Sequence, residues 1–561
     1  MSHYKSFGAV LFLLSLSMFF SKTVTGIKES NIVPVNRDSI EYGYMDKISY
    51  NPGDTALIYI SFSCTRVHGQ LHLYTVEGKP IDNVFCDLTK QNINSNKPWE
   101  NGFGFQVTFT YIIPQHLESG IYNWENRLFF IVKNKFKDAD ITIIYPSNTE
   151  EAYNEAGSKS LYDFNSAGGR ASIVSFQRPL SYYSIVNIRT YCKRFLEWMH
   201  GLIGYNIQYI ADMDMDDFRE IQKSRIVIVI GHSEYWSRNA RINFDAFVNS
   251  GKDAIILSGN TMWWQVRYSN DTKRLICYKD SVNDPESDHL LKTINWPISS
   301  LEFPVLNSIG MDFNHGAYGM KDYHGWMGYK ILKPDSPLLA GTGVDFHDIV
   351  SCQSEEYDAT LFTRYPGDDD PVVDTIALGF CKIELIGYDW GKSIYGAGLQ
   401  KSYGTFIALK KDPWSGNIIN VGFSNWCSRY GGQGAWGGFG GIDSAKIKMI
   451  TLNMMNLLLS GTNIFTDPKP CAITSIEQKT ANNKIFPNPN NGTFAFVFDK
   501  PLSEDTFLRI FNHYGNEVHS QKLKNIENSL IDITRQPEGI YYYLISNGQG
   551  MVASGKIMKS N

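Results

Sequence analysis

The sequence predicts three folded regions: an N-terminal β-sandwich, a central α/β domain with a doubly wound parallel sheet, and a small C-terminal β-sandwich. The chain has 561 residues, which is too long for a single hydrophobic core. Residues 40–132 show short alternating strands separated by turns, whereas from residue 140 short runs rich in Ile and Val alternate with helical segments. This change of period separates the first two regions.

The N-terminus has the three parts of an export signal peptide, which we expect to cover residues 1–26. Lys5 precedes an apolar stretch at residues 9–20, and small residues follow at 23–26. The apolar stretch is shorter than the roughly 20 residues that a membrane-spanning helix needs, and no later segment reaches that length. We therefore expect a mature protein that begins near Ile27 and does not span the membrane.

Residues 27–137 are predicted to form the first β-sandwich. A turn cluster at residues 51–54 precedes an apolar strand at 56–62, and further strands follow without a helical period. Eight cysteines are spread along the chain without the CxxC spacing of a structural zinc site. Cys64 and Cys86 fall in this domain and are the first pair to test for a disulfide, whereas buried free thiols are an equal expectation for the others.

Residues 138–462 are predicted to form the α/β domain. The runs at 140–145, 207–211, 225–230 and 253–258 are the expected parallel strands. Between them, one helical face is centred on Phe195 and another on Phe244, and Ser237 is placed to cap the second helix. Strands and helices alternating at this spacing predict a parallel sheet with helices on both faces.

Polar and aromatic residues follow the third and fourth predicted strands. Ligands of open parallel sheets bind beyond the carboxyl ends of the strands, where residues 231–236 and 259–264 would lie. As substrate-binding residues we expect Trp236, Asn260, Trp263 and Trp264. As catalytic residues we expect His232, Glu234, His315 and His324, because imidazole and carboxylate groups serve as general acids and bases near neutral pH.

The motifs at residues 231–237 and 258–267 resemble the catalytic domain of the large (beta) subunit of N,N-dimethylformamidase and its relatives. The segments at 152–154 and 160–163 fit the same pattern, and the resemblance covers about residues 140–460. It implies a sheet related to class I glutamine amidotransferases. It also implies, for the amidase itself, a mononuclear iron ion held by two tyrosinates and a glutamate.

On this resemblance, Tyr235 takes the place of one tyrosine ligand and Glu356 that of the carboxylate, with Glu355 one residue away. The second tyrosine, expected beside the turn at residues 259–260, appears as Trp263, which has no acidic oxygen. Phenolate and carboxylate are hard donors suited to a ferric ion, which would polarise an amide carbonyl. Iron is therefore the cofactor that we expect from the resemblance.

The C-terminal end of the chain carries a second resemblance. Residues 463–480 are polar and contain Pro468 and Pro470, as expected of a linker. The landmarks at 485–494, 539–542 and 555–559 then resemble those of the C-terminal sorting domain of proteins exported by type IX secretion, which we assign to residues 481–561. The resemblance implies recognition by the type IX secretion machinery and delivery through the periplasm to the cell surface or the medium.

Two functions are compatible with these features. The first is a secreted, metal-dependent hydrolase of amide or related C–N bonds in small, non-peptide molecules. The alternative is a non-catalytic extracellular protein that binds glycans or peptides on the same fold. Nucleic acid is excluded as an expected partner, because the net charge is −5 and no segment carries a cluster of Lys and Arg.

Deleting residues 485–561 should leave a folded protein in the periplasm, because the preceding linker should allow the remainder to fold independently. Immunoblots of periplasm, cell surface and medium measure the distribution, with the full-length chain as the control. Normal delivery of the truncated chain to the surface or the medium would contradict the assignment of the sorting domain.

Overall fold

The structure is a computed structural model. It describes residues 33–34, 39–63, 66–319, 325–350, 354–366, 369–393, 401–428, 439, 441–469, 483–498, 506–512, 517–523, 528–547 and 550–560. The predicted signal peptide, Cys64 and His324 lie outside these residues. No helix in the described ranges is long and apolar enough to cross a membrane.

The N-terminal domain is a β-sandwich, as predicted. One sheet has the order β1 (Val33–Pro34), β5 (Val67–Thr75), β8 (Gly120–Trp124), β9 (Leu128–Val132) and β3 (Ser49–Tyr50), with β6 (Pro80–Leu88) also paired to β5. The other sheet consists of β2 (Ile40–Met45), β4 (Thr55–Phe62) and β7 (Phe109–Ile112). Alternate strand residues such as Ile58, Leu73 and Trp124 are fully buried between the sheets. This alternation explains why the period of two was readable in the sequence.

The cysteines differ from the expectation. Cys86 is a free thiol buried in the core of the sandwich, so the predicted disulfide with Cys64 is wrong. On β6, Cys86 lies opposite Gly69 of the neighbouring strand and packs among apolar side chains. Cys381, in the central domain, is disulfide-bonded. An intact disulfide agrees with an oxidising compartment.

The central domain is built on a nine-stranded sheet. Its order is β12 (Ile207–Ala211), β10 (Ala139–Tyr145), β13 (Ser224–Gly231), β15 (Asp253–Ser258), β26 (Asn417–Asn420), β25 (Lys401–Lys410), β24 (Lys382–Lys392), β19 (Tyr329–Ile331) and β20 (Ile349–Val350). The first five strands are parallel, and they include all four predicted runs. The remaining pairs are antiparallel, an extension that the sequence reasoning did not foresee.

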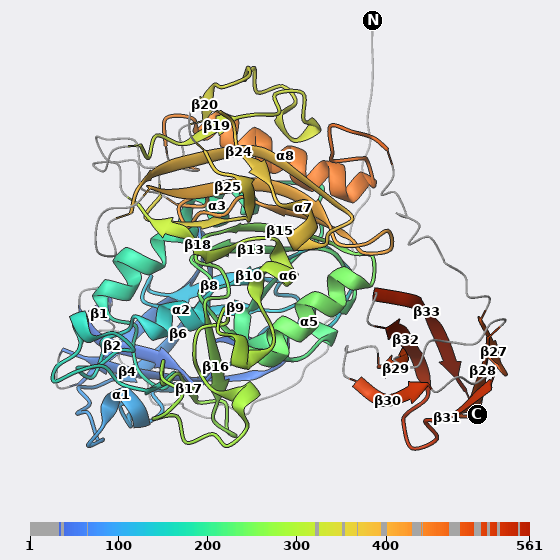
Figure 1. Ribbon diagram of the computed structural model, residues 1–561. Coiled ribbons are helices and arrows are strands. Elements are labelled where there is room, and N and C mark those ends of the chain that lie inside the picture. Colours follow the sequence, from blue (N-terminus) through green and yellow to red (C-terminus); the bar gives the residue numbers. More distant parts are fainter. Residues whose placement is uncertain are drawn as a thin grey trace, which may run out of the picture.

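Helices cover both faces of the parallel strands. Helix α3 (Thr190–His200) and α8 (Ser444–Ser460) pack on one face, and α5 (Arg238–Asn249) packs on the other. In Figure 1, α5 in green and α8 in orange lie on opposite sides of β13 and β15. Ser237 accepts a hydrogen bond from the backbone N–H of Ala240 at 2.9 Å and so caps α5 as predicted. Continuous apolar strands are buried on both faces because of this double cover.

Smaller elements surround the carboxyl ends of the parallel strands. A four-stranded sheet contains β11 (Ile173–Ser175), β17 (Arg274–Ile276), β16 (Trp264–Tyr268) and β14 (Tyr235–Ser237). A separate antiparallel pair is formed by β18 (Asp312–Tyr318) and β21 (Glu356–Ala359). The first two regions also contain short helices and strands. These are α1 (Pro98–Asn101), α2 (Ser147–Ala152), α4 (Arg219–Gln222), α6 (Val305–Ile309), α7 (Thr375–Leu378), β22 (Phe362–Arg364) and β23 (Val372–Val373). Segments distant in sequence thereby meet at one edge of the sheet.

The C-terminal region is a second, smaller sandwich, shown in red in Figure 1. One sheet contains β27 (Asn483–Phe486), β28 (Thr493–Phe498) and β31 (Asn528–Asp532). The other contains β30 (Glu517–Leu523), β29 (Thr506–Phe511), β32 (Gly539–Asn547) and β33 (Gly550–Lys559). Phe494, Phe496 and Tyr543 belong to its own core, separate from that of the central domain.

Candidate functional site

A cluster of buried polar side chains lies where β10, β13 and β15 end. His232 and Glu234 follow β13, Asn260 follows β15, and Glu356 begins β21. The backbone N–H groups of Trp263 and Trp264 both donate to the carbonyl oxygen of Glu234, at 2.8 and 2.9 Å. These bonds hold the segments after β13 and β15 against each other, as expected for the edge of a parallel sheet.

His232 lies between two carboxylates. Its Nε2 is 3.1 Å from Oε2 of Glu356 and 3.3 Å from Oε2 of Glu234. Its Nδ1 lies 3.3 Å from the carbonyl oxygen of Gly259. Burial lowers the pKa of His232, but the Glu356 carboxylate and the contact with Glu234 raise it more, to about 9. The imidazole is therefore positively charged at neutral pH and balances the buried carboxylates.

Two phenols converge on Glu234. The hydroxyl of Tyr162 donates to both carboxylate oxygens, at 2.9 and 3.0 Å, and that of Tyr153 donates to Oε2 at 3.3 Å. The two tyrosine rings are in contact, with centroids 4.2 Å apart. Burial raises the pKa of both tyrosines well above the ordinary value. In this arrangement they are neutral donors to one shared carboxylate.

Tyr235 does not lie beside Glu356, as it should if the two residues bound the same metal ion. Its hydroxyl donates to the hydroxyl of Tyr162 at 2.6 Å. Contacts then run from Tyr162 to Glu234, from Glu234 to His232, and from His232 to Glu356. The two residues predicted to share a metal ion thus stand at opposite ends of a chain of contacts.

Lys279 borders the phenols, and the sequence reasoning missed it. Its Nζ lies 3.5 Å from the centroid of the Tyr162 ring, 4.9 Å from that of Trp264 and 5.2 Å from that of Tyr235. Burial lowers the pKa of Lys279 to about 8. Burial would also raise the pKa of Glu234, but the hydrogen bond and charge of His232, together with Lys279, hold it below its ordinary value. Lys279 was missed because no motif surrounds it in the sequence.

Of the three tryptophans predicted to contact the substrate, one lies in the hydrophobic core and two are partly exposed. Trp236 is fully buried behind the site, where its ring packs against Phe244 and its indole N–H donates to Ser233. It belongs to the hydrophobic core, so the expectation that it contacts a substrate is corrected. Trp263 and Trp264 are partly exposed and lie edge to face, with centroids 6.1 Å apart.

Of the remaining histidines, His315 pairs with a neighbour on its own strand. Its Nδ1 lies 2.7 Å from Oδ1 of Asp312, and this hydrogen bond raises the pKa of His315. No contact in the described ranges joins His315 to His232 or Glu234. His324 lies outside the described residues, so its predicted catalytic role stays a prediction.

The turn that carries Asn260 is held rigidly. Asn260 has a φ of 51°, a left-handed conformation that Asn tolerates better than most residues. Its backbone N–H and that of Thr261 each donate to the buried carboxylate of Asp358 at 3.0 Å. A Cβ atom on Gly259 would approach the backbone N of Ser424 to 2.4 Å, so the turn is packed directly against neighbouring backbone.

Two acceptor atoms at this turn lack hydrogen-bond donors among the described residues. They are Oδ1 of Asn260 and Oε2 of Glu356, both buried. The ion pair with His232 is not aligned as a hydrogen bond. Burial also raises the pKa of Glu356 to about 7, against the opposing influence of His232. A buried unpaired acceptor costs about 1–3 kcal/mol, so these two atoms require an explanation.

The donors present were compared with those of the iron site implied by the resemblance. No group of three or more His, Cys, Asp or Glu side chains in the described part of the chain is arranged to hold a metal ion. Two tyrosines and a glutamate do converge, however, as Tyr153, Tyr162 and Glu234. Three hard oxygen donors of these types fit a ferric ion. Two phenols and a carboxylate are thus present together without a tyrosine at position 263.

Comparison with known proteins gives a family for the chain. A family model described as N,N-dimethylformamidase beta subunit-like, C-terminal, matches residues 81–428, more than half of the sequence. The chain belongs to this family. The matched range contains Tyr153, Tyr162, His232, Glu234 and Glu356. A second family model, for a secretion system C-terminal sorting domain, matches residues 484–560. This dimethylformamidase-like protein is therefore secreted or displayed at the cell surface by type IX secretion.

Similarity to individual proteins is weaker. No curated protein matches the chain. An immunoglobulin-like β-sandwich protein from Bacteroides vulgatus is 17% identical, with a TM-score of 0.12, over 14% of this chain and 83% of that chain. Domains 3 and 4 of rat CD4 are 18% identical, with a TM-score of 0.12, over 14% of this chain and 40% of that chain.

Replacing Gly259 with Ala should destabilise the protein by about 1–3 kcal/mol, because the new Cβ would overlap backbone atoms that cannot move aside. Urea unfolding of the mature protein measures the change. Gly201→Ala is the matched control, since its Cβ would have a nearest neighbour at 3.5 Å, an ordinary contact. Equal stability of the two variants would contradict the close packing of the turn.

Proposed function

We propose that this protein is a secreted hydrolase of amide or related C–N bonds in small molecules. The observation that carries the proposal is the buried imidazolium of His232 between Glu234 and Glu356, with two phenols on Glu234. Buried acid and base groups that shift one another's pKa values are concentrated at catalytic centres. Membership of the dimethylformamidase-like family supports the same type of bond. The parallel sheet is in keeping with the proposed relation to class I glutamine amidotransferases.

We place the proposed iron ion on Tyr153, Tyr162 and Glu234 rather than on Tyr235 and Glu356. Tyr153 and Tyr162 both donate to Glu234, so the three oxygen donors of the first set lie together. Tyr235 contacts Tyr162 and Glu356 contacts His232, so Tyr162 and His232 lie between the members of the second set. When bound, a ferric ion would act as a Lewis acid that polarises the substrate carbonyl. In this assignment Tyr235 positions the phenol of Tyr162 through its hydrogen bond.

The protein side chains supply proton handling and orientation. Glu356, whose Oε2 accepts no hydrogen bond from the described residues, is placed to accept a proton from the attacking water, and the ion pair with His232 holds its carboxylate in position. The carbonyl of Gly259 fixes the orientation of the His232 ring through Nδ1. Lys279 lies against the Tyr162 ring and near that of Trp264, so its positive charge borders the phenols.

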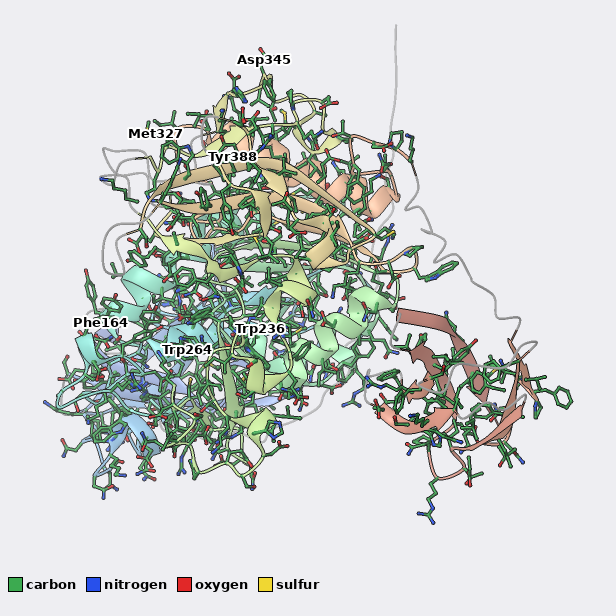
Figure 2. All side chains as sticks on the ribbon, in the orientation of Figure 1. Phe164, Trp236, Trp264, Met327, Asp345 and Tyr388 are labelled. Carbon is green, nitrogen blue, oxygen red and sulfur yellow. The ribbon has the colours of Figure 1, made fainter. Side chains whose placement is uncertain are left out.

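The alternative, a non-catalytic protein that binds glycans or peptides, has one observation in its favour. The ring of Phe164 is 63% exposed and lies 5.5 Å from that of Tyr162, so an aromatic surface adjoins the polar cluster. Figure 2 labels Phe164 near the edge of the molecule and Trp264 closer to its middle. Exposed aromatic rings are common where sugars and other flat ligands bind.

Iron reconstitution tests the proposal. Protein loaded with ferric ion should show a visible phenolate-to-iron absorption band and should release amine or ammonia from small amides. Tyr153→Phe and Tyr162→Phe should each weaken or abolish the band and lower kcat/KM at least about 100-fold, because each removes one donor oxygen while keeping the ring. Removing the metal with a chelator should abolish turnover.

Tyr235→Phe is the matched control for these variants. It removes a buried phenol that is not a ligand in this assignment, so the absorption band should remain. The band should shift, because Tyr162 loses the hydrogen bond that Tyr235 donates to it. Loss of the band in Tyr235→Phe alone would return the ligand role to Tyr235. Iron-loaded protein without amidase activity, but with glycan or peptide affinity that depends on Phe164, would favour the alternative function.

A further inference from the structure

Two buried acceptor atoms beside His232 accept no hydrogen bond from the described residues, and they indicate what the substrate must supply. Asn260 is 3% exposed, and its side chain hydrogen-bonds to the Glu356 carboxyl group, yet its Oδ1 has no donor among the described residues. Oε2 of Glu356 also accepts no hydrogen bond from the described residues, although it lies 3.1 Å from Nε2 of His232 in an ion pair. Buried acceptors in native proteins normally have partners, and a pair of exceptions at a functional site indicates a missing donor group.

These acceptors cannot easily find partners by moving. The backbone of Asn260 is fixed by Asp358 and has a left-handed conformation, and Gly259 is packed against the backbone of residues 423 and 424. The carbonyl oxygen of Glu356 accepts from the backbone N–H of Ser424 at 3.1 Å, which fixes the start of β21. Both acceptor side chains are thus carried by backbone segments that the surrounding structure holds in place.

We propose that the substrate is a primary carboxamide, whose NH2 group donates one hydrogen bond to Oδ1 of Asn260 and one to Oε2 of Glu356. This inference rests on the proposed hydrolase function and specifies its substrate class. A primary amide has two N–H donors on one nitrogen, which matches two acceptors on neighbouring side chains. The name of the family refers to N,N-dimethylformamide, which has no N–H group. Its methyl groups would leave both buried acceptors without a hydrogen bond from the substrate.

The reaction balances without an added oxidant or reductant. Water adds to the carbonyl carbon, the C–N bond breaks, and a C–O bond forms. Both protons of the water end on the leaving nitrogen, one of them passed through Glu356, and the products are a carboxylate and ammonium. Nothing is oxidised or reduced, and water is the second substrate.

Matched amide pairs test the inference. Ammonia or dimethylamine release is measured for formamide against N,N-dimethylformamide, and for acetamide against N,N-dimethylacetamide. The holoenzyme should prefer the primary amide at least about 100-fold in kcat/KM, because a site built around hydrogen bonds to a substrate rejects an analogue that lacks them. Asn260→Gly tolerates the left-handed backbone and removes the acceptor, so it should reduce this preference at least about tenfold.

The outcomes separate the inference from the proposed function. Equal or faster turnover of the dimethyl amides by the holoenzyme overturns the inference and leaves the hydrolase intact. Absence of turnover for both series, together with no shift in melting temperature by either, overturns both. Stabilisation by primary amides alone, without turnover, supports the substrate class and overturns hydrolysis. If Asn260→Gly does not fold, the preference of the unmodified enzyme still decides the question.

Discussion

The ion pair of His232 with two carboxylates is the interaction on which the rest of the site depends. Three ionisable groups are buried together, and the charged form of each would be costly alone in a medium of low dielectric constant. The imidazolium offsets the repulsion between Glu234 and Glu356, and these two residues in turn raise the pKa of His232. Removing His232 would leave the two carboxylates uncompensated, so its contacts tie the segment after β13 to the first residue of β21.

The fold supports this pairing with backbone that is held in place. The turn after β15 lies against other backbone at Gly259 and is fixed by the carboxylate of Asp358. A left-handed conformation at Asn260 persists because its surroundings determine it more strongly than its own preference does. Strained, close-packed turns at the ends of parallel strands are well suited to present polar atoms in fixed directions.

The protonation of the two phenols depends on the charge of a group bound at the site. Burial keeps Tyr153 and Tyr162 protonated, so both act as donors to Glu234 in the arrangement described. A cation among these oxygens would reverse that preference, because it would favour the anionic phenolates and release their protons. The same three residues are therefore consistent as a hydrogen-bonded cluster and as a set of hard ligands.

The sequence by itself determined the two sandwiches, the four parallel strands and the placement of His232, Glu234 and Asn260 at their ends. Apolar periodicity and short motifs encode those features locally. Tertiary structure decided the rest. Tyr153 and Tyr162 lie 81 and 72 residues before Glu234, and a spacing of that size carries no signal until the chain folds. Tyr235 and Trp236 are adjacent in β14, where successive side chains point to opposite sides, so one phenol joins the polar cluster while the indole enters the core.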